Sequence, residues 1–199
     1  QDEQGMFMER RKRTIKASPE DVFQAVSRIG GSRGWLYLNW LWVMRGLLDR
    51  FLGGPGYRER RDQNNLRMGD ALDFWRVEDV EQNEYLRLRA EMLLPGQGWL
   101  EFQVKPNDKG NTILTQTAYF APKGLLGFGY WYAMFFPHKF IFDGMIDALV
   151  IEALSIRHPD VESPQGRNPL SFRVMGIAVI TGFVAALFWL TQRGSEAES

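Results

Sequence analysis

Two groups of residues have side chains that could take part in acid–base chemistry. The first is an acidic cluster near one predicted strand, Asp70, Asp73, Glu78 and Asp79, and the second is His138 in a predicted helix. Paired carboxylates, or a histidine beside a carboxylate, can exchange protons with a substrate. Nothing nearby in the sequence completes a catalytic constellation, so solvated positions for the acids and a hydrogen-bonded core position for the histidine are the simpler interpretation. We therefore assign no catalytic residue.

Composition excludes several classes of site. The 199 residues include no cysteine and two histidines, which rules out cysteine-zinc sites and argues against a histidine-rich metal site. Lys+Arg and Asp+Glu both total 24, so no net charge favours nucleic acid. The glycine-rich stretches 53–56 and 124–129 lack the order of a phosphate or dinucleotide loop. We expect no metal, no cofactor, NAD(P)H included, and no nucleic-acid partner.

The first half of the chain predicts one strand and two helices. Alternating residues over 6–15 indicate a strand with one solvated face, although its basic run could also form a patch. Ser18 and Pro19 are a typical helix N-cap and first helical position, and this helix should end at Gly30. A second helix is expected over 35–52, with more aromatic rings than one buried face usually accommodates.

The middle of the chain predicts an antiparallel meander. Apolar and polar residues alternate with the period of two that half-buried strands show, and glycine- and proline-containing turns separate the segments. The expected strands are 71–80, 86–92, 100–104 and 112–120, with a weaker signal at 57–61 or 66–68.

A long helix is expected over 125–154. Its second half is amphipathic, with Ile141 and Met145 opposite a charged face, whereas 125–136 has no polar face and must be covered by something. Pro137 separates the halves, either as a kink or as the first residue of a new helix.

This element order resembles the helix-grip fold of the START-like (SRPBCC) superfamily. Several stretches together are also similar to the uncharacterised domain that follows an NmrA-like, short-chain-dehydrogenase-type NAD(P)-binding domain in many bacterial proteins. Those stretches are 34–37, 69–77, 86–92, 114–118 and 124–132. The resemblance covers about residues 4–155 and implies an α+β fold with an antiparallel sheet wrapped on a long C-terminal helix. It supplies no established catalytic residues, and without the nucleotide-binding half it implies no oxidoreductase activity.

The C-terminal part predicts a membrane anchor. We expect a helix-grip domain over 4–155, a linker over 156–171, a transmembrane helix over 172–192 and a polar tail over 193–199. Residues 174–192 carry no charge and as a helix would span about 28 Å, close to the roughly 30 Å hydrocarbon core. More arginines precede this span than follow it, which places the folded domain on the cytoplasmic side. Burial against a partner protein is the alternative.

Three functions follow from these observations. The first is a membrane-tethered, non-enzymatic module that binds an apolar small molecule or membrane lipid between the sheet and the long helix. The second is a structural or assembly subunit of a membrane protein complex. The third is a cyclase- or hydrolase-type enzyme that uses His138. The candidate cavity lining is Trp35, Trp40, Phe74, Phe102, Tyr130, Trp131, Met134 and His138. A closed core filled by the same rings remains the alternative to a cavity.

Overall fold

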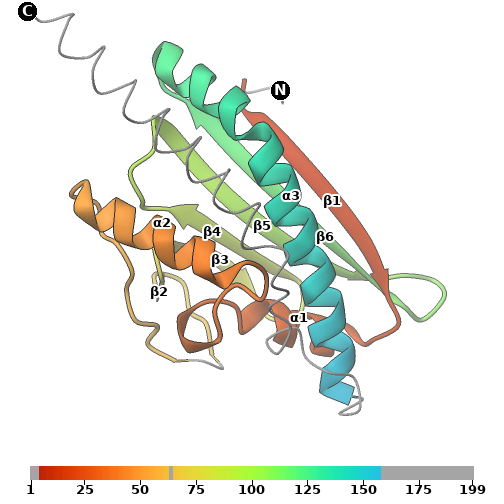
Figure 1. The fold of residues 1–199 in the computed structure, drawn as a ribbon. Coiled ribbons are helices and arrows are strands. Elements are labelled where there is room, and N and C mark those ends of the chain that lie inside the picture. Colours follow the sequence, from red (N-terminus) through yellow and green to blue (C-terminus); the bar gives the residue numbers. More distant parts are fainter. Residues whose placement is uncertain (1–4, 63–64, 158–199) are drawn as a thin grey trace, which may run out of the picture. The chain divides into compact units, whose positions relative to one another are not determined.

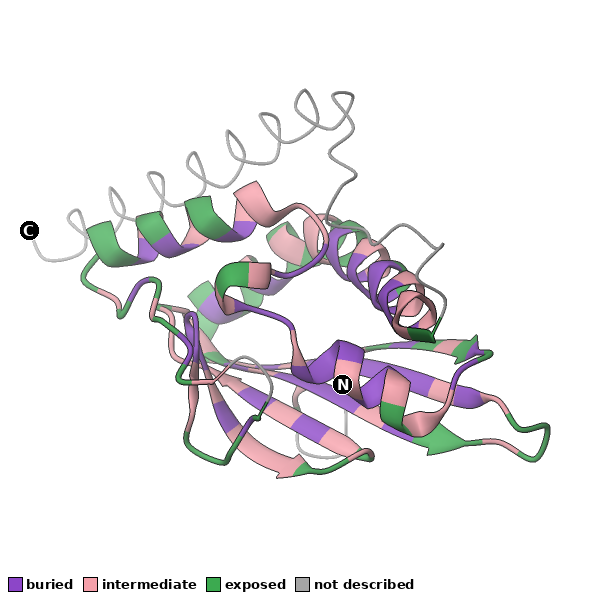
Figure 2. Ribbon diagram, turned by 90° about the horizontal axis from the view of Figure 1, so that it is seen from below, coloured by how far each residue is buried: buried purple, intermediate pink, exposed green. Residues whose placement is uncertain are grey.

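The computed structural model describes residues 5–62 and 65–157, all of which lie within residues 1–166, the first of two units of the chain. They form one six-stranded antiparallel sheet with helices on one of its faces (Figures 1 and 2). The strands follow the order β1-β6-β5-β4-β3-β2. Their bounds are β1 Phe7–Ile15, β2 Ala71–Leu72, β3 Trp75–Glu81, β4 Tyr85–Ala90, β5 Gly96–Pro106 and β6 Thr112–Pro122.

Three α-helices and one short turn of helix complete the domain. Their bounds are α1 Pro19–Ser27, η1 Gly31–Arg33, α2 Asn39–Phe51 and α3 Gly124–Arg157. The Ser18 side chain accepts a hydrogen bond from the Asp21 amide at 3.2 Å, so the predicted N-cap of α1 is confirmed. Helix α3 crosses β1 and β6 and packs against α1. The expected arrangement, an antiparallel sheet wrapped on a long C-terminal helix, is therefore confirmed.

The long helix differs from the prediction at Pro137 and at its C-terminal end. Pro137 lies inside one continuous helix, so the alternative of a new helix starting there is wrong. The helix also continues to Arg157, two residues past the expected domain end at 155.

The second helix begins later than predicted. Leu36 and Leu38 have positive φ angles of 64° and 50°, which a helix does not allow, so α2 starts at Asn39 rather than at Trp35. The bend carries the Trp35 ring into the core, where it is fully buried. Tertiary packing thus overrides the local helical pattern of this stretch.

Two strand predictions also need correction. Asp73 has a φ of 54°, which interrupts the segment predicted as one strand and divides it into β2 and β3. Within the described residues, neither 57–61 nor 66–68 forms a strand. In the first stretch, Arg60 instead donates hydrogen bonds to the carbonyls of Ser27 and Ile29 at 2.6 and 2.8 Å.

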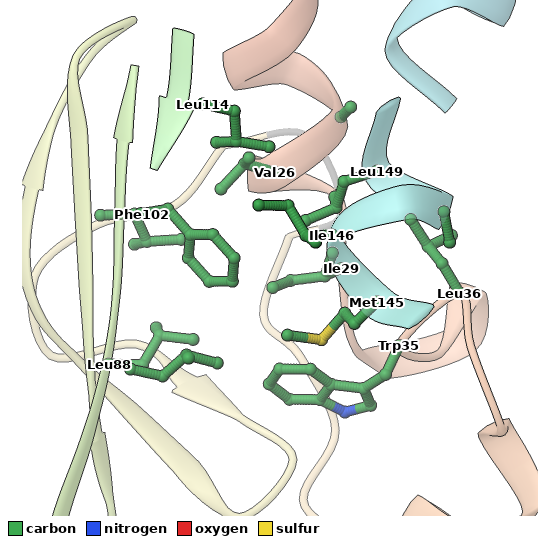
Figure 3. Close-up of a cluster of buried hydrophobic side chains, with 14 of the residues drawn as sticks. Val26, Ile29, Trp35, Leu36, Leu88, Phe102, Leu114, Met145, Ile146 and Leu149 are labelled. Atoms are coloured by element: carbon green, nitrogen blue, oxygen red, sulfur yellow. The ribbon is translucent and has the colours of Figure 1, made fainter. Parts of the chain in front are cut away.

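The core lies between the inner face of the sheet and the helices. Figure 3 shows Leu88, Phe102 and Leu114 projecting from the strands toward Met145 and Ile146 of α3. Burying each such side chain stabilises the fold by about 1.5–3 kcal/mol, and this burial is the main source of stability. The predicted amphipathic face of the second half of α3 is confirmed by this packing.

The segment predicted as a membrane anchor follows the last described residue, Arg157. No helix within residues 5–62 and 65–157 is both long enough and apolar enough for a bilayer crossing. The predicted transmembrane helix over 172–192, the polar tail and nearly all of the predicted linker lie outside the described residues.

Candidate ligand-binding site

A polar cluster lies on the inner face of β1 and β6, beneath α3. The two strands pair antiparallel with Arg11 opposite Gln116, and Gln116 in turn lies opposite Phe102 of β5. Side chains directly opposite each other on one face of such a pair have Cβ atoms about 4.5–5.5 Å apart. Gln116 is fully buried and Arg11 nearly so. A polar row therefore borders the apolar floor of the sheet at Phe102.

Arg11 joins this row to α3. Its guanidinium pairs with Glu9 at 2.5 Å and with Asp143, and it donates to the Lys139 carbonyl at 3.3 Å. It also lies over the Phe142 ring, 5.6 Å from the centroid. Helix α3 is thus fixed to β1 by a buried cation with two anionic partners.

Four buried side-chain atoms of this cluster have no hydrogen-bond partner among the described residues. They are Oε2 of Glu9, Nη1 of Arg11, and both Nε2 and Oε1 of Gln116. A buried polar group without a partner costs about 1–3 kcal/mol, and native proteins leave few of them. Such a concentration at one place marks a position where a water or a ligand completes the hydrogen bonding.

His138 lies on the helix side of this region, between two aromatic rings. Its ring centroid is 5.4 Å from that of Phe142 and 6.4 Å from that of Tyr130. Burial, together with the nearby positive charges of Arg11 and Arg45, lowers the pKa of His138 to about 4. At neutral pH the imidazole is therefore uncharged, with one nitrogen donor and one nitrogen acceptor. Its contacts within the described residues include no carboxylate, so it has no acid–base partner there.

The eight predicted lining residues do not form one group. Trp35, Phe74 and Phe102 are fully buried in the main core, where the Trp35 and Phe74 rings stack at 6.2 Å. Trp131 and Tyr130 belong instead to a second cluster, around Phe7 and Phe120. Trp40 and Met134 are partly exposed. His138 lies between the two clusters, because its ring partners Phe142 and Tyr130 belong to different ones.

The acidic residues near β3 do not converge on a site. Asp70 pairs with Arg61 at 2.9 Å and Glu78 with Arg87 at 2.7 Å, as solvated ion pairs do. Asp73 is buried and accepts hydrogen bonds from the Trp35 indole at 2.8 Å and the Gly31 amide at 3.1 Å. Burial raises its pKa, and these hydrogen bonds oppose that rise. No three His, Asp or Glu side chains in the described ranges are placed to hold a metal ion.

Sequence reasoning missed Glu9, Arg11 and Gln116. A signal was present, because Gln116 stands between Leu114 and Ala118 at the inward positions of an alternating strand. A polar residue at an inward position demands a partner. The alternation of β1 likewise places Arg11 on the face that carries Phe7 and Ile15.

A scan against protein families matched residues 4–145 to one family, described as proteins of unknown function (DUF2867). The chain belongs to this family. That description agrees with the expectation of an uncharacterised domain. No curated protein matched the sequence.

Several solved structures are similar to this chain at low identity. An aromatase/cyclase from a Streptomyces strain is 15% identical over 75% of this chain and 94% of its own, with a TM-score of 0.47. Truncated norcoclaurine synthase from Thalictrum flavum is 11% identical over 77% and 94%, with a TM-score of 0.46. The protein XoxI from Bacillus cereus is 16% identical over 76% and 98%, with a TM-score of 0.45. Similarity at this level carries no argument about activity or ligand.

Proposed function

We propose that this protein is a non-enzymatic START-like module that binds an apolar or amphipathic ligand, such as a lipid, between the inner face of the sheet and α3. The observation that carries the proposal is the group of unpartnered polar atoms on Glu9, Arg11 and Gln116, next to the apolar floor at Phe102. A ligand with a polar group and an apolar body would satisfy both surfaces.

The surroundings of His138 support binding rather than catalysis. A histidine that is neutral at pH 7 and lies between two aromatic rings can donate a hydrogen bond to a ligand or accept one from it. General acid–base work needs a partner that orients the imidazole and stabilises its charge. The cyclase- or hydrolase-type reaction therefore gains no support from this geometry.

Binding of a neutral apolar probe tests the proposal. We expect N-phenyl-naphthylamine to bind the parent protein with increased fluorescence, and Met134→Trp to displace it at little cost in stability. Phe102→Trp should act in the same way if its ring borders open space, whereas overpacking a closed core costs about 1–3 kcal/mol. Tyr119→Trp, on the outer face of β6, is the matched control and should leave probe binding unchanged. A large stability loss in both Met134→Trp and Phe102→Trp, with no probe binding to the parent protein, would contradict the ligand-binding proposal.

The membrane tether is part of the same proposal and rests on the uncharged segment 174–192. Deletion of residues 170–199 should move the protein from the membrane fraction to the soluble fraction. Protease protection in sealed vesicles should place the domain on the cytoplasmic side. A truncated chain that still resists carbonate extraction would contradict the tether.

A second candidate, a subunit of a membrane protein complex, is favoured by exposed apolar side chains on two helices. Figure 2 shows a largely exposed outer side of α2. Phe51 at its end is 86% exposed, and Phe136 on α3 is 77% exposed. The other exposed apolar residues of these helices include Val43, Met44, Leu47, Leu52, Leu125, Leu126, Phe128, Tyr132, Phe135 and Phe140. The first half of α3 was expected to be covered, and no other described part of the chain covers these side chains.

Exposed apolar patches of this kind mark protein or membrane contacts. Purification from detergent-solubilised native membranes separates the two candidates. A stoichiometric protein partner that is lost in a Leu47→Ser, Phe51→Ser variant supports the subunit. A bound lipid without such a partner supports the ligand-binding module.

A further inference from the structure

The unpartnered atoms of the polar cluster have a definite chemical pattern. Arg11 Nη1 and Gln116 Nε2 are hydrogen-bond donors, whereas Glu9 Oε2 and Gln116 Oε1 are acceptors. Because both ends of the Gln116 amide lack a partner, exchanging its oxygen and nitrogen would leave the pattern unchanged. The site therefore offers two donors and two acceptors to whatever occupies it.

These atoms lie on neighbouring residues of one surface. Arg11 and Gln116 are opposite each other in the β1–β6 pair, and Glu9 is held to Arg11 by an ion pair of 2.5 Å. Asp143 of α3 pairs with Nε of the same guanidinium. A single small polar group can therefore reach both strands.

The charge of the cluster is already balanced. Arg11 carries one positive charge and has two carboxylate partners, Glu9 and Asp143, the second of which also binds Lys139 at 3.1 Å. An anionic head group would meet the free oxygen of Glu9, and a cationic one would meet the free nitrogen of Arg11. The electrostatics thus favour a neutral polar group.

We propose, on the basis of the proposed ligand-binding function, that Arg11 and Gln116 select a neutral ligand that carries a carbonyl oxygen beside a hydroxyl or N–H donor. The carbonyl oxygen accepts from Arg11 Nη1 and Gln116 Nε2. Gln116 Oε1 or Glu9 Oε2 accepts a hydrogen bond from the hydroxyl or N–H group of the ligand. Primary amides, protonated carboxylic acids and hydroxyketones on an apolar body share this chemistry, and the body lies against Phe102 and Phe142.

A set of naphthalene probes with different head groups tests this selectivity by calorimetry or fluorescence. Naphthamide has the carbonyl and the donor, methyl naphthoate has the carbonyl alone, and methylnaphthalene has neither. We expect naphthamide to bind about tenfold more tightly than methylnaphthalene, with methyl naphthoate between them. A tenfold difference is what one net hydrogen bond, worth about 1 kcal/mol or slightly more, provides. Naphthoate, which is anionic at pH 7, should bind more weakly than naphthamide.

The variant Gln116→Leu should reduce the preference for naphthamide over methylnaphthalene to about twofold or less, without weakening methylnaphthalene. Gln116→Met provides the same test if leucine does not fit. Gln103→Leu is the matched control, since Gln103 lies on β5 next to Phe102 and points to the opposite face. It should keep the parent preference.

Failure of this inference can be told apart from failure of the proposed function. If methylnaphthalene and naphthamide bind the parent equally well, the site binds apolar ligands but the assigned head-group selectivity is wrong. The same conclusion follows if both Gln116 variants keep the parent preference. If N-phenyl-naphthylamine and all four probes fail to bind the parent, the proposed function is wrong and the selectivity is overturned with it.

Discussion

Two fully buried polar side chains of this protein, Asp73 and Gln116, differ in what surrounds them. Asp73 accepts hydrogen bonds from the Trp35 indole and the Gly31 amide, whereas neither polar atom of Gln116 has a partner among the described residues. Both are 0% exposed. Buried polar groups therefore have two different roles in this protein. A group with partners inside the chain holds segments of the fold together, and a group without them is free to recognise something else.

Asp73→Ala should have the largest effect on stability. The change leaves the Trp35 indole and the Gly31 amide buried without an acceptor, and should cost about 3 kcal/mol in the free energy of unfolding, measured by urea denaturation. Asp70→Ala is the matched control, because Asp70 pairs with an exposed arginine and its loss should cost about 1 kcal/mol or less. Equal losses in the two variants would contradict the structural role of Asp73.

His138→Leu should change how stability depends on pH. The folded-state pKa of about 4 lies below the usual 6.5, so the unfolded chain binds a proton that the folded chain excludes between these values. The stability from neutral His138 is fully present above about pH 6.5 and is lost as the pH falls toward 4. We expect the parent to lose about 1 kcal/mol over this range, a value reduced for partial exposure, and the variant to lose less. Equal acid slopes in denaturant titrations would show that folding does not lower the pKa of His138.

Glu91→Gln tests a partnered carboxylate on the surface, in a lower pH range. Hydrogen bonds from Arg76 and then Arg58 lower the pKa of Glu91 to about 2. A depressed carboxylate pKa contributes stability above about pH 4.5 that is lost as the pH falls toward 2. We expect a cost of about 1 kcal/mol or less at pH 7, since the arginines are partly solvated. The cost should disappear near pH 2 in thermal unfolding. A cost that persisted at that pH would have another cause.

Gln116→Leu should have the smallest effect on stability, in contrast to Asp73→Ala. Removing an amide that has no partner should leave the free energy of unfolding within about 0.5 kcal/mol of the parent, or raise it. Urea denaturation of the ligand-free protein measures this directly. A loss of about 2 kcal/mol or more would show that Gln116 holds the fold as Asp73 does.

Much of the architecture could be predicted from local patterns. The alternation in β1, β4, β5 and β6 and the Ser18 cap of α1 lie within a few residues of sequence, where side-chain period and capping chemistry act. Prediction was wrong where tertiary contacts decided the backbone. The backbone directly after Trp35 is not helical, and the Trp35 indole donates a hydrogen bond to Asp73. Asp73 itself has a left-handed conformation that interrupts a predicted strand.

The sequence by itself determined the classes of chemistry open to this protein. The absence of cysteine, the two histidines and the lack of a dinucleotide loop follow from composition and order alone. Only the tertiary structure decided where the buried polar groups meet. Arg11 reaches a carboxylate 132 residues away, and Gln116 lies beside Arg11 because of strand register. Strand pairing and helix packing bring distant residues together, and no local pattern reports which buried groups they leave without partners.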